Sequence, residues 1–281
     1  MDKYTVLHQI GKGAYGSVYK VACRNTGKCL AMKCHNNEGT SVSESTVREL
    51  SCLFSLKGHP YVVDILDCFV SEGRIATIMT YHPYTLQRLI YNGRGCPRST
   101  PLSFVASFSV QIANALSYMH GLNIIHRDLA PPNVLLTDDL VVKVADMGLS
   151  RNAVKWMSST VVTEPYRAPE LFVKDVTAQY TCAIDMWSLG VLIADAMEGK
   201  PVFLSKNVKG SKVSTYEVIL KTVGPPELSD CKPAKAIISR LLTFSRVIRM
   251  QILQCAWLRV RHRNNLVCIG SSCVLHQMKV I

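Results

Sequence analysis

The sequence predicts an α+β protein with two lobes, a small β-rich N-terminal lobe and a larger α-helical C-terminal lobe. Residues 4–35 alternate apolar and polar positions around glycines, which is the pattern of strands joined by turns. From about residue 84 the apolar residues recur mainly at helical spacing. The 281 residues are 48% hydrophobic and 19% charged, so the chain can bury a sizeable core and is not a disordered sequence.

The N-terminal lobe is predicted to span residues 1–83. Residues 4–35 are expected to form three strands, with a turn at 25–27. Residues 43–57 change to helical spacing. The segments 61–70 and 74–81 are expected to add two more strands. The helix carries an apolar stripe formed by Val47, Leu50, Leu53, Phe54 and Leu56.

The C-terminal lobe is predicted to span residues 84–230. A long amphipathic helix is expected over 103–120, a short strand pair over 133–137 and 141–146, and a buried helix over 185–198. The most apolar stretch, "MWSLGVLIADAM", contains Asp195 and is too short to cross a bilayer. We therefore expect no membrane partner.

The charge of the chain is unevenly distributed. The net charge is +12, and residues 231–281 hold nine Lys or Arg and no Asp or Glu. This basic, atypical tail contributes +9, which leaves +3 for the first 230 residues. Because the main domain is not notably basic, we expect no nucleic-acid partner.

Cysteine usage indicates a reducing compartment. The eleven cysteines follow no framework spacing, and the polar start at Asp2 and Lys3 does not resemble a signal peptide. Reduced thiols in a cytoplasmic or nuclear protein are the expected state.

The first motif that carries chemistry is Gly11-x-Gly13-x-x-Gly16-x-Val18. Glycines let a backbone fold over phosphate groups without side-chain clashes. The same spacing also fits a dinucleotide-binding turn, which leads from a strand into a helix. Here "SVYKVAC" continues as a second strand and βαβ alternation is missing, which argues against an oxidoreductase. An ordinary glycine-rich hairpin remains an alternative.

Two charged residues of the predicted N-terminal lobe are expected to pair. Lys33 lies in a strand between apolar neighbours, so it needs a partner or a ligand. Glu49 follows sixteen residues later on the predicted helix. A Lys33–Glu49 ion pair would aim the ammonium at nucleotide phosphates, whereas a surface pair would contribute little.

The stretch "IIHRDLAPPN" holds a second set of polar residues. It contains His126, Arg127, Asp128 and Asn133, and Asp146 follows eighteen residues after Asp128. Two carboxylates and an amide oxygen are suitable ligands for Mg²⁺, which prefers oxygen atoms and keeps substrate phosphates in its shell. The spacing therefore predicts a phosphoryl-transfer site.

The order of these motifs over about residues 4–226 resembles eukaryotic protein kinases. Later segments, "PYRAPEL" with Glu170 and "AIDMWSLG" with Asp185, fit the same pattern. Within that family, "IGKGAYGSVYK", "STVREL", "YTCAIDMWSLG" and "KPVF…VILKTVGPPE" resemble the cyclin-dependent and MAP kinase branch, the CMGC group. The resemblance implies the two-lobed kinase fold, ATP and Mg²⁺ as cofactors, and transfer of the γ-phosphate to Ser or Thr of protein substrates.

The resemblance also implies a role for each site residue. Lys33 would hold the ATP phosphates and Asp128 would receive or orient the substrate hydroxyl proton. Asn133 is implied as a further catalytic residue and, with Asp146, as a metal ligand. The residues implied to bind ATP are Ile10, Gly11, Gly13, Gly16, Val18, Ala31, Lys33, Glu49, the gatekeeper Met79, and Tyr81 and His82 in a hinge over 80–82.

Ala130 departs from the family pattern. Serine/threonine kinases usually carry a lysine there that touches the γ-phosphate, and Pro131 and Pro132 supply no cation in its place. Losing one such contact costs about 2–4 kcal/mol of transition-state stabilisation, so we expect a weakened but active kinase. The alternative is a pseudokinase or truncated product that binds nucleotide or a partner with little catalysis.

Regulation and the chain end complete the expectations. The candidate phosphorylation sites are Ser158, Ser159, Thr160 and Tyr15, and Arg127 could pair with a phosphate on the first three. A cyclin-like or other regulatory subunit is expected on the "STVREL" helix. The family normally continues with more helices and an arginine that pairs with Glu170, but 231–281 show no such segment. The C-terminal lobe is therefore expected to be truncated or divergent after about residue 230, by an altered reading frame, a retained intron or a divergent ending, or else a true basic tail that binds acidic partners.

Overall fold

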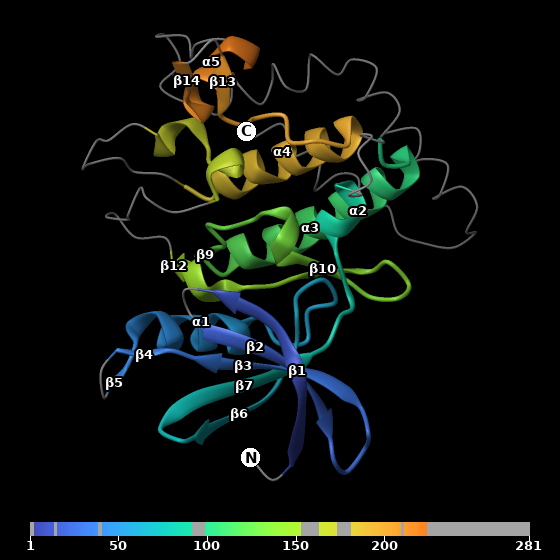
Figure 1. The fold of residues 1–281 in the computed structure, drawn as a ribbon, viewed down its shortest axis with the longest axis vertical. Coiled ribbons are helices and arrows are strands. Elements are labelled where there is room, and N and C mark those ends of the chain that lie inside the picture. Colours follow the sequence, from blue (N-terminus) through green and yellow to red (C-terminus); the bar gives the residue numbers. More distant parts are fainter. Residues whose placement is uncertain are drawn as a thin grey trace.

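The computed structural model describes residues 3–13, 16–38, 41–91, 99–152, 163–172, 181–208 and 211–223. Two lobes are visible in Figure 1, with the sheet below and the helices above. The predicted two-lobed architecture, with a β-rich N-terminal lobe and a larger helical C-terminal lobe, is confirmed.

The N-terminal lobe is a five-stranded antiparallel sheet in the order β1-β2-β3-β7-β6. Its face away from Lys33 holds a small core of Val21, Leu30, Met32, Ala76 and Ile78. A cavity of about 150 Å³ opens on that same face and contains none of the predicted site residues. The strands are β1 (Tyr4–Gly13), β2 (Gly16–Cys23), β3 (Cys29–His35), β6 (Ile65–Ser71) and β7 (Arg74–Thr80).

Helix α1 (Glu44–Ser55) lies beside this sheet. It follows a two-residue-strand hairpin, β4 (Asn37–Glu38) and β5 (Ser41–Val42). Ser43 caps the helix, because its hydroxyl accepts a hydrogen bond of 3.2 Å from the Thr46 N–H. The helix predicted over 43–57 is confirmed, with its ends shortened by the cap and by the turn after Ser55.

The strand predicted over 61–70 begins later than expected. Val62 forms a parallel bridge with Val144, and the Val63 N–H donates to the Val144 carbonyl at 2.9 Å. These residues are therefore attached to the C-terminal lobe, and the strand of the N-terminal sheet starts only at Ile65. The residues before Ile65 and those after it are apolar in the same way, which is why the sequence predicted one strand over 61–70.

The chain enters the C-terminal lobe after β7. Strand β8 (Tyr84–Thr85) pairs with β10 (Val134–Leu136), which also pairs with β11 (Val142–Val144). Helix α2 (Leu86–Ile90) follows. A second small sheet joins β9 (Ile124–Ile125) to β12 (Arg151–Asn152).

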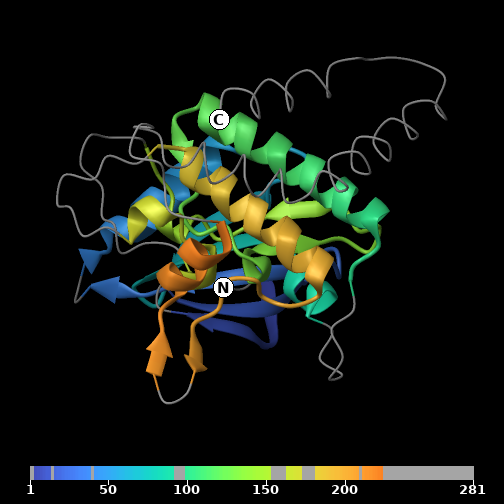
Figure 2. The same cartoon turned by 90° about the horizontal axis from the view of Figure 1, so that it is seen from above.

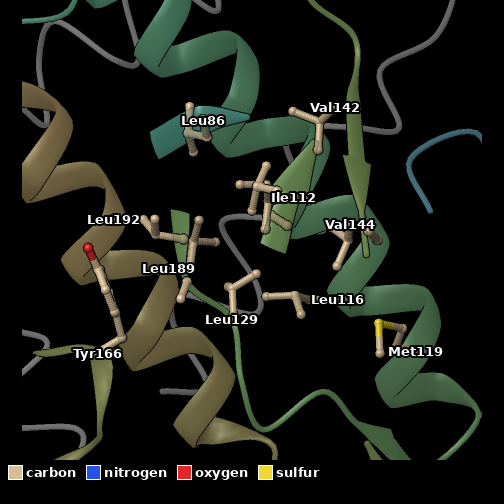
Figure 3. Close-up of a cluster of buried hydrophobic side chains, with 14 of the residues drawn as sticks. Leu86, Ile112, Leu116, Met119, Leu129, Val142, Val144, Tyr166, Leu189 and Leu192 are labelled. Carbon is tan, nitrogen blue, oxygen red and sulfur yellow. The ribbon is translucent and has the colours of Figure 1, made fainter. Parts of the chain in front are cut away.

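Two long helices, α3 (Leu102–Gly121) and α4 (Ala183–Glu198), run side by side in Figure 2 and organise this lobe. Figure 3 shows how Ile112 and Leu116 of α3 meet Leu189 and Leu192 of α4. Helix α3 is long and apolar enough to cross a membrane, with a mean hydropathy of 1.2 over 18 of its residues. However, 44% of those residues are buried in the lobe. The remaining elements in the described ranges are the 3₁₀ helices η1 (Pro131–Asn133), η2 (Met147–Leu149), η3 (Glu164–Tyr166) and η4 (Pro169–Leu171), the strands β13 (Lys206–Val208) and β14 (Ser211–Val213), and α5 (Thr215–Val223).

Candidate active site

Lys33 is the centre of an ion-pair cluster that joins the two lobes. Its ammonium Nζ lies 2.6 Å from Oε1 of Glu49 on α1. The same atom lies 3.3 Å from Oδ1 of Asp146, which belongs to the C-terminal lobe. Lys33 is 7% exposed and Glu49 is 2% exposed. The expected Lys33–Glu49 pair is confirmed, and it is buried rather than a weak surface pair.

The contacts set the charges of this cluster. Burial acts to lower the pKa of Lys33, but the carboxylates of Glu49 and Asp146 outweigh it and hold that pKa above its ordinary value. Burial acts to raise the pKa of Asp146, but the charge and hydrogen bond of Lys33 outweigh it and hold that pKa below its ordinary value. The Lys33 ammonium and the Asp146 carboxylate are therefore both charged at neutral pH.

The glycine motif ends a hairpin beside this cluster. Gly13 of β1 stands opposite Gly16 of β2, and Val18 of β2 stands opposite Lys33 of β3. A Cβ atom at Gly16 would lie 2.3 Å from the carbonyl oxygen of Cys34, so only glycine permits this approach of β2 to β3. The strand–hairpin–strand context predicted for the motif is confirmed.

The other residues implied to bind the nucleotide base lie on the same strands. Ala31 of β3 stands opposite Met79 of β7, and Gly11 stands opposite Val18. Paired residues of neighbouring antiparallel strands share a face. Ala31 and Met79 therefore share the face that carries Lys33. Ile10, next to Gly11, is 42% exposed.

The predicted hinge directly follows β7. The side chains of Thr80 and His82 are hydrogen bonded, with Nε2 to Oγ1 at 2.8 Å. Burial lowers the pKa of His82 to about 4, so its imidazole is neutral at physiological pH. The Lys20 ammonium lies 4.6 Å from the centre of the Tyr81 ring, a cation–π contact between β2 and the hinge. The hinge is thus held to the N-terminal lobe by a side-chain contact as well as by the backbone.

Asp185 holds the loop that carries Asp128. Its Oδ1 accepts a 2.9 Å hydrogen bond from the Arg127 N–H, and its Oδ2 accepts one of 2.9 Å from the His126 N–H. His120 Nε2 is 2.8 Å from Oδ2. Arg127 has a φ of 66°, a left-handed conformation that is costly for a residue other than glycine. The Asp185 carboxylate therefore stabilises a strained backbone.

The Asp128 side chain is bound at both oxygens. Oδ2 accepts a 2.9 Å hydrogen bond from Asn133 Nδ2. Oδ1 accepts hydrogen bonds from the Thr163 N–H at 2.9 Å and the Thr163 hydroxyl at 2.8 Å. These three donors fix the orientation of the carboxylate. Thr163 contacts Asp128 from 35 residues away in the chain, and its place two residues before the "PYRAPEL" segment was the available signal.

Asn133 and Asp146 are neighbours and fit a hard cation. The Ala145 N–H donates to the Asn133 carbonyl at 2.9 Å, which places Asp146 beside Asn133. The Asp146 side chain is 41% exposed, so its carboxylate can reach a ligand. Asn133 uses Nδ2 for Asp128, and its Oδ1 accepts no hydrogen bond from the described residues. A carboxylate and a free amide oxygen are the donor types that suit Mg²⁺ together with phosphate oxygens.

Ala130 is fully buried. Ala130 belongs to the main apolar core and directly precedes η1, which begins at Pro131. Among the described residues, no lysine or arginine forms an ion pair with Asp128.

Glu170 is a partly buried residue, and one oxygen of its carboxylate is buried and unsatisfied. Its Oε2 has no hydrogen-bond partner in the part of the chain that the structure describes. Burial raises the pKa of Glu170 above its ordinary value. The candidate phosphorylation sites Tyr15, Ser158, Ser159 and Thr160, and the tail over 231–281, lie outside the described residues.

His35 is a further polar residue beside the cluster that the sequence motifs did not indicate. His35 is 1% exposed on β3, and its Nε2 lies 2.8 Å from the hydroxyl of Thr77 on β7. Its Nδ1 lies 3.8 Å from Oε2 of Glu49. The i,i+2 spacing from Lys33 places both side chains on one face of the strand, and this was the available signal.

Comparison with known proteins places this arrangement in a family. The model of the protein kinase domain matches residues 4–258, beyond the 4–226 over which the motifs show the resemblance. The chain is 33% identical over 223 residues to "Cell division control protein 2 homolog 3" of Trypanosoma brucei brucei, covering 78% of this chain and 70% of that protein. It is 31% identical over 231 residues to "Cyclin-dependent kinase 2" of Caenorhabditis elegans, covering 80% of this chain and 61% of that protein.

Proposed function

The chain belongs to the protein kinase family, in its branch similar to cyclin-dependent kinases, and on this premise we propose that it transfers the γ-phosphate of ATP to serine or threonine hydroxyls of proteins. The observation that carries the proposal is the contact of 3.3 Å between Lys33 Nζ and Asp146 Oδ1. This contact brings the Lys33 ammonium of the N-terminal lobe and the Asp146 carboxylate of the C-terminal lobe together next to the glycine hairpin. A carboxylate is a type of group that binds metal ions.

Each residue then has a task that follows from its contacts. Lys33, held by Glu49, presents its ammonium to the phosphates of ATP. Asp128 orients the substrate hydroxyl and accepts its proton while the hydroxyl oxygen bonds to the γ-phosphorus and ADP leaves. Asn133 and Thr163 keep the Asp128 carboxylate in position.

Mg²⁺ would be held by Asn133 and Asp146, and when bound it supplies charge neutralisation at the phosphate oxygens. The residues contribute positioning and electrostatic stabilisation rather than covalent chemistry. The missing cation at Ala130 lowers the expected rate by roughly two to three orders of magnitude relative to a site that has it.

The test is turnover of Mg-ATP on a generic basic protein, comparing the wild type with Asp146→Asn. We expect Asp146→Asn to lose at least about a hundredfold in rate and to lose the Mg²⁺ dependence of nucleotide binding. Asp139→Asn, at an exposed position of the same lobe, is the matched control. Equal activity and equal Mg²⁺ dependence in wild type and Asp146→Asn would refute the metal assignment.

A pseudokinase or truncated product is the second candidate, and Ala130 favours it. In the same assay, Ala130→Lys should raise the rate, whereas Ala130→Met adds similar volume without a charge. Both substitutions overpack a buried position and should lower the melting temperature. Nucleotide binding without turnover in the wild type and in Ala130→Lys would support the pseudokinase.

Two further expectations belong to the proposal. We propose a cyclin-like regulatory subunit on α1, supported by the exposed side chains of Val47 and Phe54, which are 57% and 54% exposed. We also propose a cytoplasmic or nuclear location. All six cysteines in the described part of the chain are free thiols, which fits a reducing compartment. Finding the protein in a secretory fraction of expressing cells would contradict this location.

A further inference from the structure

His35 places a buried polar nitrogen beside the ion pair of the site. Its imidazole is 1% exposed. Nε2 is 2.8 Å from the hydroxyl of Thr77, and Nδ1 is 3.8 Å from Oε2 of Glu49. Nδ1 has no hydrogen-bond partner among the described residues. A buried polar atom without a partner is costly, so its direction toward a carboxylate oxygen needs a reason.

The surroundings select one tautomer of this ring. Burial, and then the nearby charge of Lys33, lower the pKa of His35 to about 4 against the opposing effect of Asp146, so the ring is neutral at physiological pH. A neutral imidazole has one N–H and one acceptor nitrogen. If Nδ1 were the acceptor, its lone pair would face the Glu49 carboxylate, which is repulsive. With the proton on Nδ1, Nε2 accepts from the Thr77 hydroxyl and both contacts are favourable.

We propose that His35 is a positioning residue for Glu49, with its Nδ1–H directed at Oε2 while Lys33 holds Oε1. The two oxygens of the carboxylate are then held from two residues of β3, and α1 is fixed relative to the sheet. At 3.8 Å, Nδ1 and Oε2 attract each other electrostatically but are not hydrogen bonded. A movement of about 1 Å brings them to hydrogen-bond distance. Through Glu49, His35 sets the place of the Lys33 ammonium. The kinetic consequence rests on the proposed function, but the contact itself does not.

The matched variants are His35→Asn and His35→Gln. Both are neutral, polar and smaller than histidine, so they share the general loss of packing. The asparagine amide can occupy the place of Nδ1, whereas the glutamine amide reaches toward the place of Nε2. We expect His35→Asn to keep kcat within about threefold of wild type and His35→Gln to lose about tenfold, with KM for ATP raised in the latter. Equal kcat and KM in the two variants would overturn the proposal.

A readout that needs no turnover is the tautomer of His35. Nitrogen NMR of histidine-labelled protein should show the proton of this ring on Nδ1, with the signal assigned by its absence in His35→Asn. A proton on Nε2 in the wild type would overturn the proposal whatever the kinetics of the variants. In Glu49→Gln, the Nδ1–H resonance should shift. A correct tautomer in a protein without turnover would leave this inference standing and refute only the proposed function.

Discussion

Replacing Asp185 by asparagine tests whether one buried carboxylate holds the catalytic loop. Asp185 is 1% exposed and accepts hydrogen bonds from the N–H groups of His126 and Arg127, one at each oxygen. Asparagine keeps one oxygen, and its NH₂ group would face a backbone donor. One buried N–H is then unpaired, which costs about 1–3 kcal/mol. The left-handed backbone of Arg127, a strain of about 1–3 kcal/mol, also loses one of its constraints.

We therefore expect Asp185→Asn to lose about 2–4 kcal/mol of unfolding free energy, from the unpaired donor and the lost charge-assisted bonds. Because Asp128 directly follows Arg127, kcat of the folded protein should fall at least about tenfold. Urea unfolding followed by circular dichroism measures the first quantity, and turnover at temperatures well below melting measures the second.

The control is Asp195→Asn on the same helix. Asp195 is also buried, but it accepts from the hydroxyls of Tyr91 and Tyr166 and from the Val202 N–H, not from the loop. It should destabilise the protein while leaving kcat of the folded fraction unchanged. If Asp185→Asn lost less than about 0.5 kcal/mol, within the range of an ordinary surface substitution, with kcat unchanged, the anchoring argument would be wrong.

Two other changes follow from the structure. Burial raises the folded-state pKa of Glu170 above the ordinary value of 4.5, which the unfolded chain keeps, so the charged form of Glu170 destabilises the fold. The unfolding free energy should therefore fall as the pH rises from 4.5 through the folded-state pKa. Glu170→Gln should remove this pH dependence and raise the unfolding free energy by about 1–3 kcal/mol at neutral pH but by little at pH 4. The control is Glu164→Gln, at an exposed position. An unchanged pH dependence of the melting temperature in Glu170→Gln would contradict the assignment. On α1, Val47→Glu should weaken the binding of a purified cyclin, measured by calorimetry, without changing the melting temperature. Val70→Glu on β6, where the residue is 72% exposed, should leave cyclin binding unchanged. Equal binding by the wild type and both variants would exclude this face of α1 as the binding surface.

Residue spacing was enough to predict most strands and helices of the N-terminal lobe and the two main helices of the C-terminal lobe. Helix α1 has a clear helical spacing of apolar residues, and glycines and turn residues mark where β1, β2 and β3 begin and end. The 61–70 segment shows where this fails. Its first residues bond to Val144, and a strand pattern does not say which sheet the strand will join. The hairpin of β13 and β14 was also not predicted, since both strands are only three residues long.

The residue types of the candidate site could be read from the sequence. A lysine in an apolar strand and an Asp–Asn pair in a short loop are unusual unless they have a functional role. The order of the motifs also indicated the protein kinase family, because each motif has its own fixed spacing of residues. Whether the implied roles are performed is what the variants above measure.

By itself the sequence determined which residue types are present and how far apart they lie along the chain, and so the two lobes, the glycine hairpin and the kinase family. Only the tertiary structure decided that Lys33 contacts both Glu49 and Asp146, that Thr163 binds Asp128, and that His35 faces Glu49. These contacts join residues up to 113 positions apart. Local spacing determines secondary structure, but distances between elements arise from packing of their buried faces, and that packing places the charges.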